Sequence, residues 1–295
     1  MEQTWHDLLF AHWPVEVERL RGVVPVELPL DTYRERAWVG VVPFWMSGIR
    51  GRFLPPLPGL SQFPELNVRT YVVRDGKPGV YFFSLDAASL PAVWTARATY
   101  RLPYFHARMR VEERDGRIRY ASQRIQPPTP AVFRGVYRPV GEVELRQPGS
   151  LEHWLTERYC LYTTAEGRVY RGEIHHEPWP LQDAEATIQE NSVAETAGIA
   201  LPEEAPLLHF ARRVRVLIWA IERICVRGRT RPSPISGKGG FSPSLNNEAP
   251  DYQSIETRAE ECMNRITGRT HHRFIRVVKR SVQQHRAPRP LPELH

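Results

Sequence analysis

Residues 61–109 read SQFPELNVRTYVVRDGKPGVYFFSLDAASLPAVWTARATYRLPYFHARM, and this stretch decides the fold. Side chains alternate between apolar and polar over residues 66–73, with several β-branched residues, which predicts a strand. Residues 75–79 (DGKPG) are turn-forming and close a hairpin. Residues 80–85 are apolar or aromatic on both faces apart from Ser84, which predicts a central strand covered on both sides.

The period changes after this hairpin: residues 87–98 predict a helix with Ser89 as N-cap and Pro91 in its first turn. Short helices are also expected at residues 14–20 and 151–157. Strands are predicted at residues 5–13, 36–46, 105–113, 117–124, 131–140, 160–164, 168–175, 184–191 and 207–224.

Residues 1–224 therefore predict one mainly β (α+β) domain of about ten short strands and a few short helices. Several of these strands are apolar on both faces, and unpaired strand edges are a liability. A closed or nearly closed antiparallel barrel is the most economical arrangement, because it covers both faces and removes the edges.

The positive charge of the chain belongs to its C-terminal part. Residues 225–295 hold 13 Lys+Arg against 6 Asp+Glu, whereas the preceding 224 residues hold 27 of each sign. This part is rich in Pro, Gly and Arg and is predicted to be largely disordered, with weak helical spacing over residues 253–283. The balanced charge of residues 1–224 argues against nucleic-acid binding by the barrel. For residues 225–295 two interpretations stay open: binding to acidic partners or nucleic acid, and a poorly folded extension without a function.

Several classes of protein are disfavoured by what the sequence lacks. No run of apolar residues is long enough for a membrane span, and the N-terminus does not resemble a signal peptide. The three cysteines are far apart, which favours a reducing, cytoplasmic setting. No dinucleotide, Walker or Ser-hydrolase motif is present, so no cofactor is expected. Adjacent His175 and His176 point to opposite faces of a strand, so no metal site is expected, and Trp179 is predicted to pack on the barrel.

Polar side chains on one strand face form the first candidate site. Glu65, Asn67 and Arg69 are two residues apart and share a face of the strand at residues 66–73. If this face points into the barrel, Arg69 can grip a ligand carboxylate through two hydrogen bonds. The alternative is the solvated outer face of the sheet, and the alternation fits both interpretations.

A second group of candidates follows the helix. Tyr104 and His106 project to the same side of the strand that begins there, and Arg97 lies shortly before them. Together they provide an acid, a base and an anion partner. The alternative is a buried Tyr and His that are satisfied by the backbone. Asp86, which directly precedes the helix, is expected to serve as a helix-entry cap rather than an acid.

Long motifs in a fixed order make the chain similar to the YqjF-like proteins, a family of the acetoacetate decarboxylase-like superfamily. The similarity runs from about residue 5 to residue 224 and leaves the tail uncovered. The motifs that carry it are HDLLFAHWPV, RAWVGVVPFWMSGIR, LPPLPGLSQFPELNVRTYV, GVYFFSLDA, LPYFHARM and HHEPWPLQDAEA.

This resemblance implies a cone-like β-barrel with a central pocket. Acetoacetate decarboxylases use a Schiff-base lysine in a Pro-Lys-Lys setting. In the similar string here, Tyr104 stands at the position of the reactive lysine and Phe105 at that of its neighbour, and a phenol cannot form an imine. Lys77, in the predicted turn, is the single lysine of residues 1–224. Glu65 resembles the pocket glutamate of the decarboxylase pattern.

We therefore expect a small-molecule-binding barrel for an organic acid, without Schiff-base decarboxylation. Tyr104, His106 and Glu65 are the candidate catalytic residues, and Arg97, Arg69 and Asn67 are the candidate ligand-binding residues. The alternative is a non-catalytic scaffold that binds a ligand or a partner. Turnover and a homo-oligomer both stay open at this point.

Overall fold

The computed structural model describes residues 1–224 except residues 52–54, 56–60 and 126–130. The predictions made for residues 225–295, including the helix at 253–283, lie outside the described residues. Three α-helices are formed in the described part, at α1 (Val17–Arg21), α2 (Leu90–Tyr100) and α3 (Leu151–Thr156). None of these helices has the length and the apolar character needed to cross a membrane.

Twelve strands dominate the described residues. They are β1 (Glu2–Val15), β2 (Ala37–Arg50), β3 (Phe63–Arg74), β4 (Lys77–Ala87), β5 (Tyr104–Arg114), β6 (Arg117–Arg124), β7 (Val132–Glu144), β8 (Cys160–Ala165), β9 (Arg168–His176), β10 (Leu181–Asn191), β11 (Leu207–Ile218) and β12 (Glu222–Ile224). The mainly β architecture is confirmed. The predicted last strand at residues 207–224 is two strands, because the chain leaves the ladder at residues 219–221.

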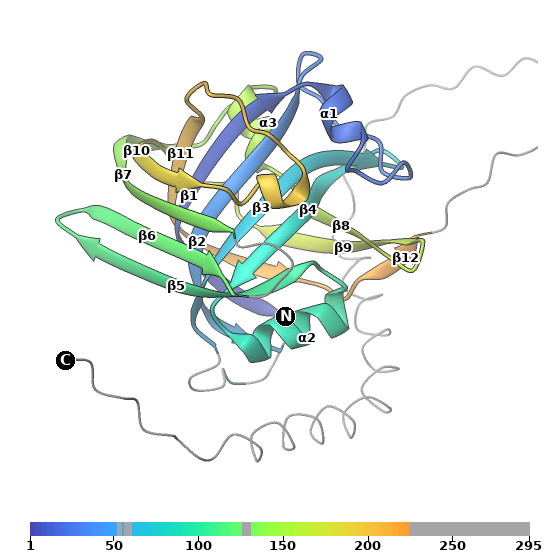
Figure 1. The fold of residues 1–295 in the computed structure, drawn as a ribbon, viewed down its shortest axis with the longest axis horizontal. Helices are drawn as coiled ribbons and strands as arrows, with labels where there is room; N and C mark the ends of the chain where they lie inside the picture. Colours follow the sequence, from blue (N-terminus) through green and yellow to red (C-terminus); the bar gives the residue numbers. More distant parts are fainter. Residues whose placement is uncertain (52–54, 56–60, 126–130, 225–295) are drawn as a thin grey trace, which may run out of the picture. The chain divides into compact units, whose positions relative to one another are not determined.

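The strands belong to one sheet in the order β12-β9-β8-β4-β3-β2-β1-β11-β10-β7-β6-β5 (Figure 1). A further pairing between β4 and β5 closes a ring through β6, β7, β10 and β11. A second pairing between β9 and β11 closes another ring through β8. Both rings share the five strands β4-β3-β2-β1-β11. The predicted closed sheet is therefore confirmed, and closure removes most of its edges.

The sheet is mixed, which corrects the antiparallel prediction. β4 pairs in parallel with β5 and with β8, whereas the other pairings are antiparallel. Helix α2 forms the crossover from β4 to β5, as a parallel connection requires. Ser89 caps this helix as predicted, since its Oγ accepts a hydrogen bond from the Ala92 amide at 3.4 Å.

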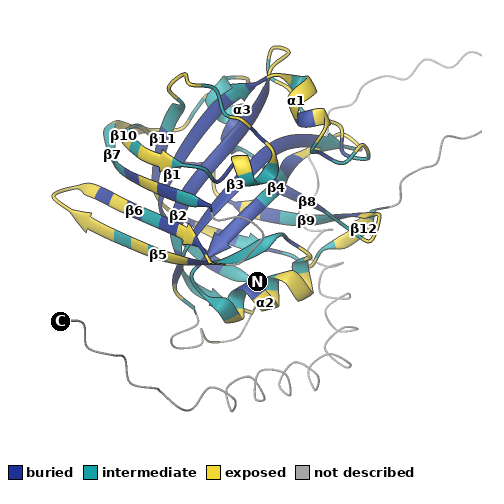
Figure 2. Ribbon diagram, in the orientation of Figure 1, coloured by how far each residue is buried: buried dark blue, intermediate teal, exposed yellow. Residues whose placement is uncertain are grey.

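The shared strands separate two apolar clusters, and Figure 2 shows that burial is concentrated on them. On β3, Leu66, Val68 and Val72 join one cluster, and Tyr71 joins the other. Glu65, Asn67 and Arg69 are on the Tyr71 side by strand alternation and are only 3%, 5% and 7% exposed. This polar face therefore lies inside the protein and is not the solvated outer face.

Candidate functional site

Glu65 and Tyr104 meet although they lie on different strands. Glu65 is near the start of β3 and pairs with Ala87 of β4, and Tyr104 begins β5 and pairs with Leu85 of β4. Because β4 lies between them, the phenol reaches across it. Its Oη donates a hydrogen bond to Glu65 Oε2 at 2.8 Å. The structure thus brings together two of the three predicted catalytic residues.

Burial makes both groups neutral near neutral pH. It raises the pKa of Glu65 to about 8; the hydrogen bond from Tyr104 opposes this rise, and nearby Asp86 adds to it. Burial, with the neighbouring Glu65, also holds the pKa of Tyr104 well above 10. Tyr104 as a whole residue is half-buried, but its hydroxyl end is enclosed. A carboxylic acid with a pKa near 8 is suited to general acid–base chemistry at physiological pH.

Tyr120 fixes the backbone beneath this pair. It extends from β6, and its hydroxyl lies 2.6 Å from the carbonyl oxygen of Glu65 and 3.0 Å from that of Phe44. The single hydroxyl proton is shared between these two acceptors. Tyr120 is buried, so it holds the start of β3 against β2 at the point where the Glu65 side chain leaves the strand.

A buried ion pair stands next to the site. Arg124 Nε donates to Asp86 Oδ1 at 2.8 Å, and its Nη1 donates to Thr196 Oγ1 at 3.1 Å. Burial outweighs the attraction of Arg124 and raises the pKa of Asp86. The expectation that Asp86 caps the helix was wrong. Asp86 lies within β4, and the capping role belongs to Ser89 alone.

The remaining candidates of the β5 region lie closer to the surface. Arg97 is on the exposed side of α2, and its Nε donates to the backbone carbonyl of Tyr104 at 2.6 Å. Its guanidinium lies 5.5 Å from the ring centre of Phe105. His106 is half-buried on β5 and pairs with Ala87. Their functional roles stay predictions.

Lys77 lies outside the barrel, as the turn prediction requires. It begins β4 after the hairpin turn, half of its side chain is exposed, and its Nζ binds Glu173 Oε1 at 3.0 Å. The other two lysines of the chain lie beyond residue 224. No lysine of residues 1–224 is therefore placed for imine formation inside the barrel.

The histidine pair behaves as its spacing predicts. His175 is exposed, whereas His176 is 3% exposed and its ring contacts Trp179 at 4.9 Å between ring centres. Trp179 packs on the core, which confirms its structural role. Within the described ranges, no three His, Cys, Asp or Glu side chains gather in a way that could hold a metal ion.

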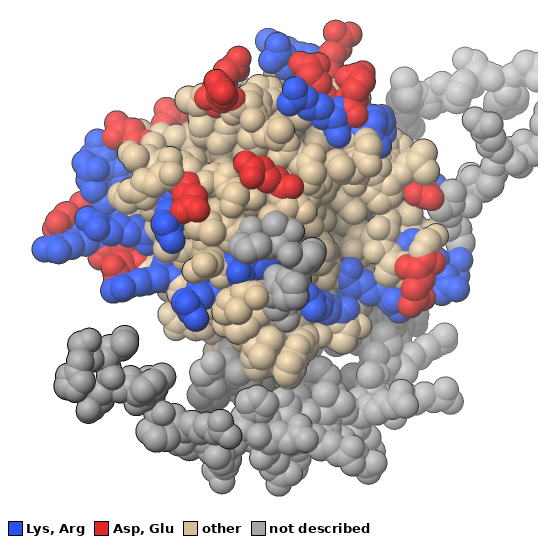
Figure 3. Space-filling model, in the orientation of Figure 1, with Lys and Arg blue, Asp and Glu red and all other residues tan. Residues whose placement is uncertain are grey.

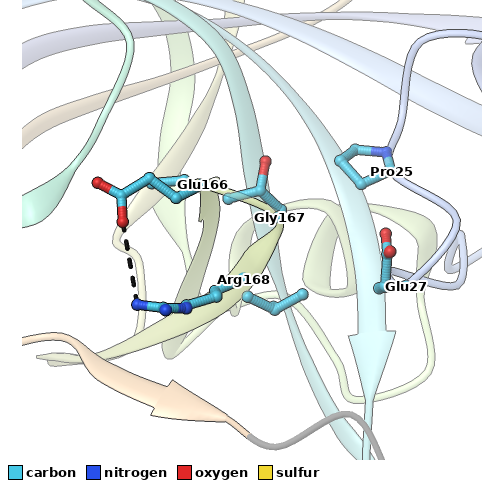
Figure 4. A pocket seen from close by; sticks show the side chains of 8 residues that line it. Pro25, Glu27, Glu166, Gly167 and Arg168 are labelled. Carbon is cyan, nitrogen blue, oxygen red and sulfur yellow. Dashed lines mark ion pairs between the residues drawn. The ribbon is translucent and has the colours of Figure 1, made fainter.

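Two surface hollows lie away from Glu65. One, of about 210 Å³, is formed at the turn between β8 and β9, where Glu166 and Arg168 form an ion pair opposite Pro25 and Glu27 (Figure 4). The other, of about 360 Å³, lies beside Trp13. On the face shown in Figure 3, basic and acidic side chains are interspersed, in keeping with the balanced charge of the barrel.

Sequence reasoning missed the residues that support the site from distant strands. Tyr120 and Arg124 contact positions 55 and 38 residues away, and no local spacing signals such contacts. His12 and Tyr71 were also missed. His12 Nε2 lies 2.7 Å from the Tyr71 hydroxyl, on the same side of β3 as Arg69.

Comparisons with known proteins agree with this architecture. The model of the family DUF2071, described as an uncharacterized conserved protein, matches residues 2–215. The YqjF protein of Bacillus subtilis (strain 168) is 50% identical over 223 residues, which cover 76% of this chain and 92% of that protein.

Solved structures share the fold at low sequence identity. The enduracididine biosynthesis enzyme MppR complexed with pyruvate is similar with a TM-score of 0.54 and 12% identity, over 75% of this chain and 89% of that one. An acetoacetate decarboxylase matches with a TM-score of 0.52 and 12% identity, over 76% and 89%. An acetoacetate decarboxylase-like enzyme from Sphingomonas wittichii RW1 matches with a TM-score of 0.52 and 11% identity, over 76% and 92%. The chain therefore has the acetoacetate decarboxylase-like fold.

Proposed function

Since the chain belongs to the DUF2071 family and has an acetoacetate decarboxylase-like fold, we propose that it is a barrel that binds a small organic acid beside Glu65 and Tyr104. The observation that carries this proposal is the enclosed hydrogen bond between these two side chains, at 2.8 Å. The reaction that this pair supports is proton transfer and not imine formation.

The pair can move one proton without any covalent intermediate. Glu65, protonated below its pKa of about 8, can donate its proton to a carbonyl or hydroxyl oxygen of the ligand. The carboxylate that remains keeps the hydrogen bond from Tyr104, and a hydrogen bond to an ionised group is stronger than one between neutral groups. His106, two residues after Tyr104, is the proposed general base, and Arg97 the proposed anion partner.

The fold likeness supports the class of ligand. One similar structure is an enzyme complexed with pyruvate, and others are acetoacetate decarboxylases. Imine chemistry is not proposed here, because Tyr104 stands where the resembling family has its lysine and Lys77 is exposed.

A thermal-shift screen of the full chain against small keto, hydroxy and aromatic acids tests the proposal. A ligand that binds only the folded state raises the melting temperature. We expect at least one acid to do so, with the shift reduced in Tyr104→Phe, His106→Gln and Arg97→Ala. Tyr81→Phe is the matched control, since Tyr81 is a partly buried tyrosine of β4 that packs in the other apolar cluster.

The outcomes separate clearly. If no acid stabilises the wild-type chain, or if the shift in Tyr104→Phe equals that in Tyr81→Phe, the Glu65–Tyr104 pair does not bind the ligand. Treatment with a ketone and borohydride should leave the intact mass unchanged, and a mass gain of one reduced ketone would restore the imine mechanism.

The second candidate is a barrel that binds its ligand or a partner without turnover. It is favoured by the near-complete burial of Glu65, which is 3% exposed. Incubation with any acid found in the screen decides between the two. Product that forms with the wild type and is lost in Glu65→Gln indicates an enzyme, and binding without product indicates a scaffold.

A further inference from the structure

A row of three residues crosses β1, β2 and β3 on the side of the sheet that also carries Glu65. His12 pairs with Gly40, and Gly40 pairs with Arg69. A Cβ atom on Gly40 would lie 3.0 Å from His12 Cδ2 and 3.5 Å from Arg69 Cγ. The imidazole therefore packs tightly over Gly40, and the absence of a side chain there lets His12 and Arg69 lie close to each other across β2.

Arg69 is buried without a compensating carboxylate. It is 7% exposed, its Nε has no hydrogen-bond partner, and it forms no ion pair within the described part of the chain. The neighbouring Arg158 differs, because it is paired with Asp31. Arg69 interacts with the Tyr71 hydroxyl, but a buried guanidinium without a counterion still destabilises a fold unless an anion neutralises it.

The polar neighbours of Arg69 do not supply that negative charge. Burial, with Arg69 and His209 nearby, holds the pKa of His12 well below its ordinary 6.5, so the imidazole is neutral. Burial raises the pKa of Tyr71 above 10, so its phenol is neutral as well. His12 Nδ1 also lacks a hydrogen-bond partner among the residues that the structure describes. The group keeps one net positive charge and an open hydrogen-bonding position.

Aromatic rings surround this charge. The guanidinium carbon of Arg69 lies 5.4 Å from the ring centre of Phe10 and 5.9 Å from that of Tyr71. The Trp154 ring lies 4.9 Å from the Tyr71 ring. A site with one buried cation and apolar walls suits a carboxylate attached to an apolar body better than it suits an inorganic anion.

We propose that Arg69 and His12, which flank Gly40, form a binding subsite for the carboxylate of a monocarboxylic acid. This proposal rests on the proposed function and extends it: Arg69 binds the carboxylate, and Arg97 is the partner of the negative charge that develops on the oxygen function at the Glu65 end. Asn67 lies between Arg69 and Glu65 on the same face, and its Oδ1 is buried without a partner. Glu65 and Arg69 are four positions apart along β3, which corresponds to about 13 Å. The full ligand is therefore an elongated acid, with its carboxylate at Arg69 and an oxygen function at Glu65.

The test uses the full chain and two series of probes, namely acetate, hexanoate, benzoate and 4-phenylbutyrate, and the matching neutral amides. We expect carboxylates, and not their amides, to raise the melting temperature. Arg69→Met should weaken carboxylate binding by about 10- to 100-fold, as expected for the loss of a charged hydrogen bond. Arg134→Met is the matched control, because Arg134 is an exposed arginine of β7 that pairs with Glu190.

Gly40→Ala provides a second variant that keeps the charge and displaces the His12 ring by the added methyl group, so it should weaken the same carboxylates. The proposal is overturned if no carboxylate raises the melting temperature, if amides act equally, or if the shift survives in Arg69→Met and in Gly40→Ala. Tyr104→Phe should leave the binding of these probes intact, because none of them carries a second oxygen function for the Glu65 end. Failure of the Glu65 end is thus distinguishable from failure of the Arg69 subsite.

Discussion

At the scale of single residues, Glu65 combines a large burial penalty with a single side-chain hydrogen bond from the described residues. Its carboxyl group receives the Tyr104 hydroxyl, whereas buried Asp86 nearby has the full charge of Arg124 to offset burial. The two acids therefore differ in protonation because their hydrogen-bonding partners differ in charge. The one without a cation carries its proton at neutral pH, as is typical of acids that donate protons.

The first prediction concerns stability against pH. The folded-state pKa of Glu65 is about 8 and its unfolded value is near 4.5, so unfolding releases a proton between these values. Its contribution to the free energy of unfolding is therefore largest below about pH 4.5 and falls until about pH 8. Glu65→Gln should remove this slope and exceed the wild type at alkaline pH, by about 1.4 kcal/mol for each unit of pKa shift.

Urea unfolding of both chains from about pH 5 to about pH 8.5 measures this difference. Burial lowers the pKa of His176 and of His209 in both chains, so their contributions cancel in the difference. Parallel stability curves for the two chains would show that Glu65 ionises as an ordinary carboxyl group.

At the scale of elements, β4 belongs to both rings, and Gly79 allows it to approach β8. A Cβ atom on Gly79 would lie 2.6 Å from the carbonyl oxygen of Cys160 and 2.7 Å from the Tyr162 ring. The carbonyl oxygen of Cys160 belongs to the backbone, so it cannot move aside by a change of rotamer. The parallel pairing of β4 with β8 thus depends on the absence of a side chain at this position.

Gly79→Ala should therefore destabilise the barrel by about 1–3 kcal/mol through overpacking. Gly22→Ala is the control, because a Cβ there would meet its nearest atom at an ordinary 4.0 Å. Denaturant midpoints measure both variants. Equal midpoints would mean that β4 and β8 separate easily, and the second ring would not be a rigid part of the fold.

The Asp86–Arg124 ion pair is a second contact of β4, and it joins this strand to β6. Its side chains are 0% and 3% exposed, so removing one partner leaves a buried charge without its counterion. Asp86→Asn and Arg124→Met should each lower the free energy of unfolding by about 3–5 kcal/mol, and the double variant by less than the sum. Arg134→Met, at the exposed pair with Glu190, should lower it by at most about 1 kcal/mol. Additive losses in a double-mutant cycle would contradict direct coupling.

At the scale of the whole molecule, local patterns predict the elements well. Alternation predicts β3, a run that is apolar on both faces predicts β4, turn residues predict the hairpin between them, and Ser89 predicts the start of α2. Which face of β3 is buried could not be predicted, because Glu65, Asn67 and Arg69 have the polarity of an outer face. Only ring closure through β5 and β9 places them inside. The parallel pairings of β4 were not predicted for the same reason, since the local sequence does not determine which strands pair with each other.

The candidate site was predicted in part. Glu65 and Tyr104 were predicted from their positions on strand faces and from their resemblance to a family pattern. Their contact spans 39 residues and depends on β4 lying between β3 and β5. The supporting residues Tyr120 and His12 could not be predicted from local spacing, because each contacts a partner on a strand that is distant in sequence. Asp86 was assigned wrongly because a carboxylate just before a helix is a common cap.

The most direct test of the account is an infrared titration of the Glu65 carboxyl group, read as the difference between the wild-type chain and Glu65→Gln. We predict an absorption of a protonated carboxylic acid at neutral pH that disappears as the pH rises through about 8. In Tyr104→Phe the same transition should move to higher pH, because the hydrogen bond that favours the carboxylate is gone. A transition near the ordinary value of 4.5, unchanged in Tyr104→Phe, would contradict the central claim that Glu65 and Tyr104 form a buried proton-donating pair.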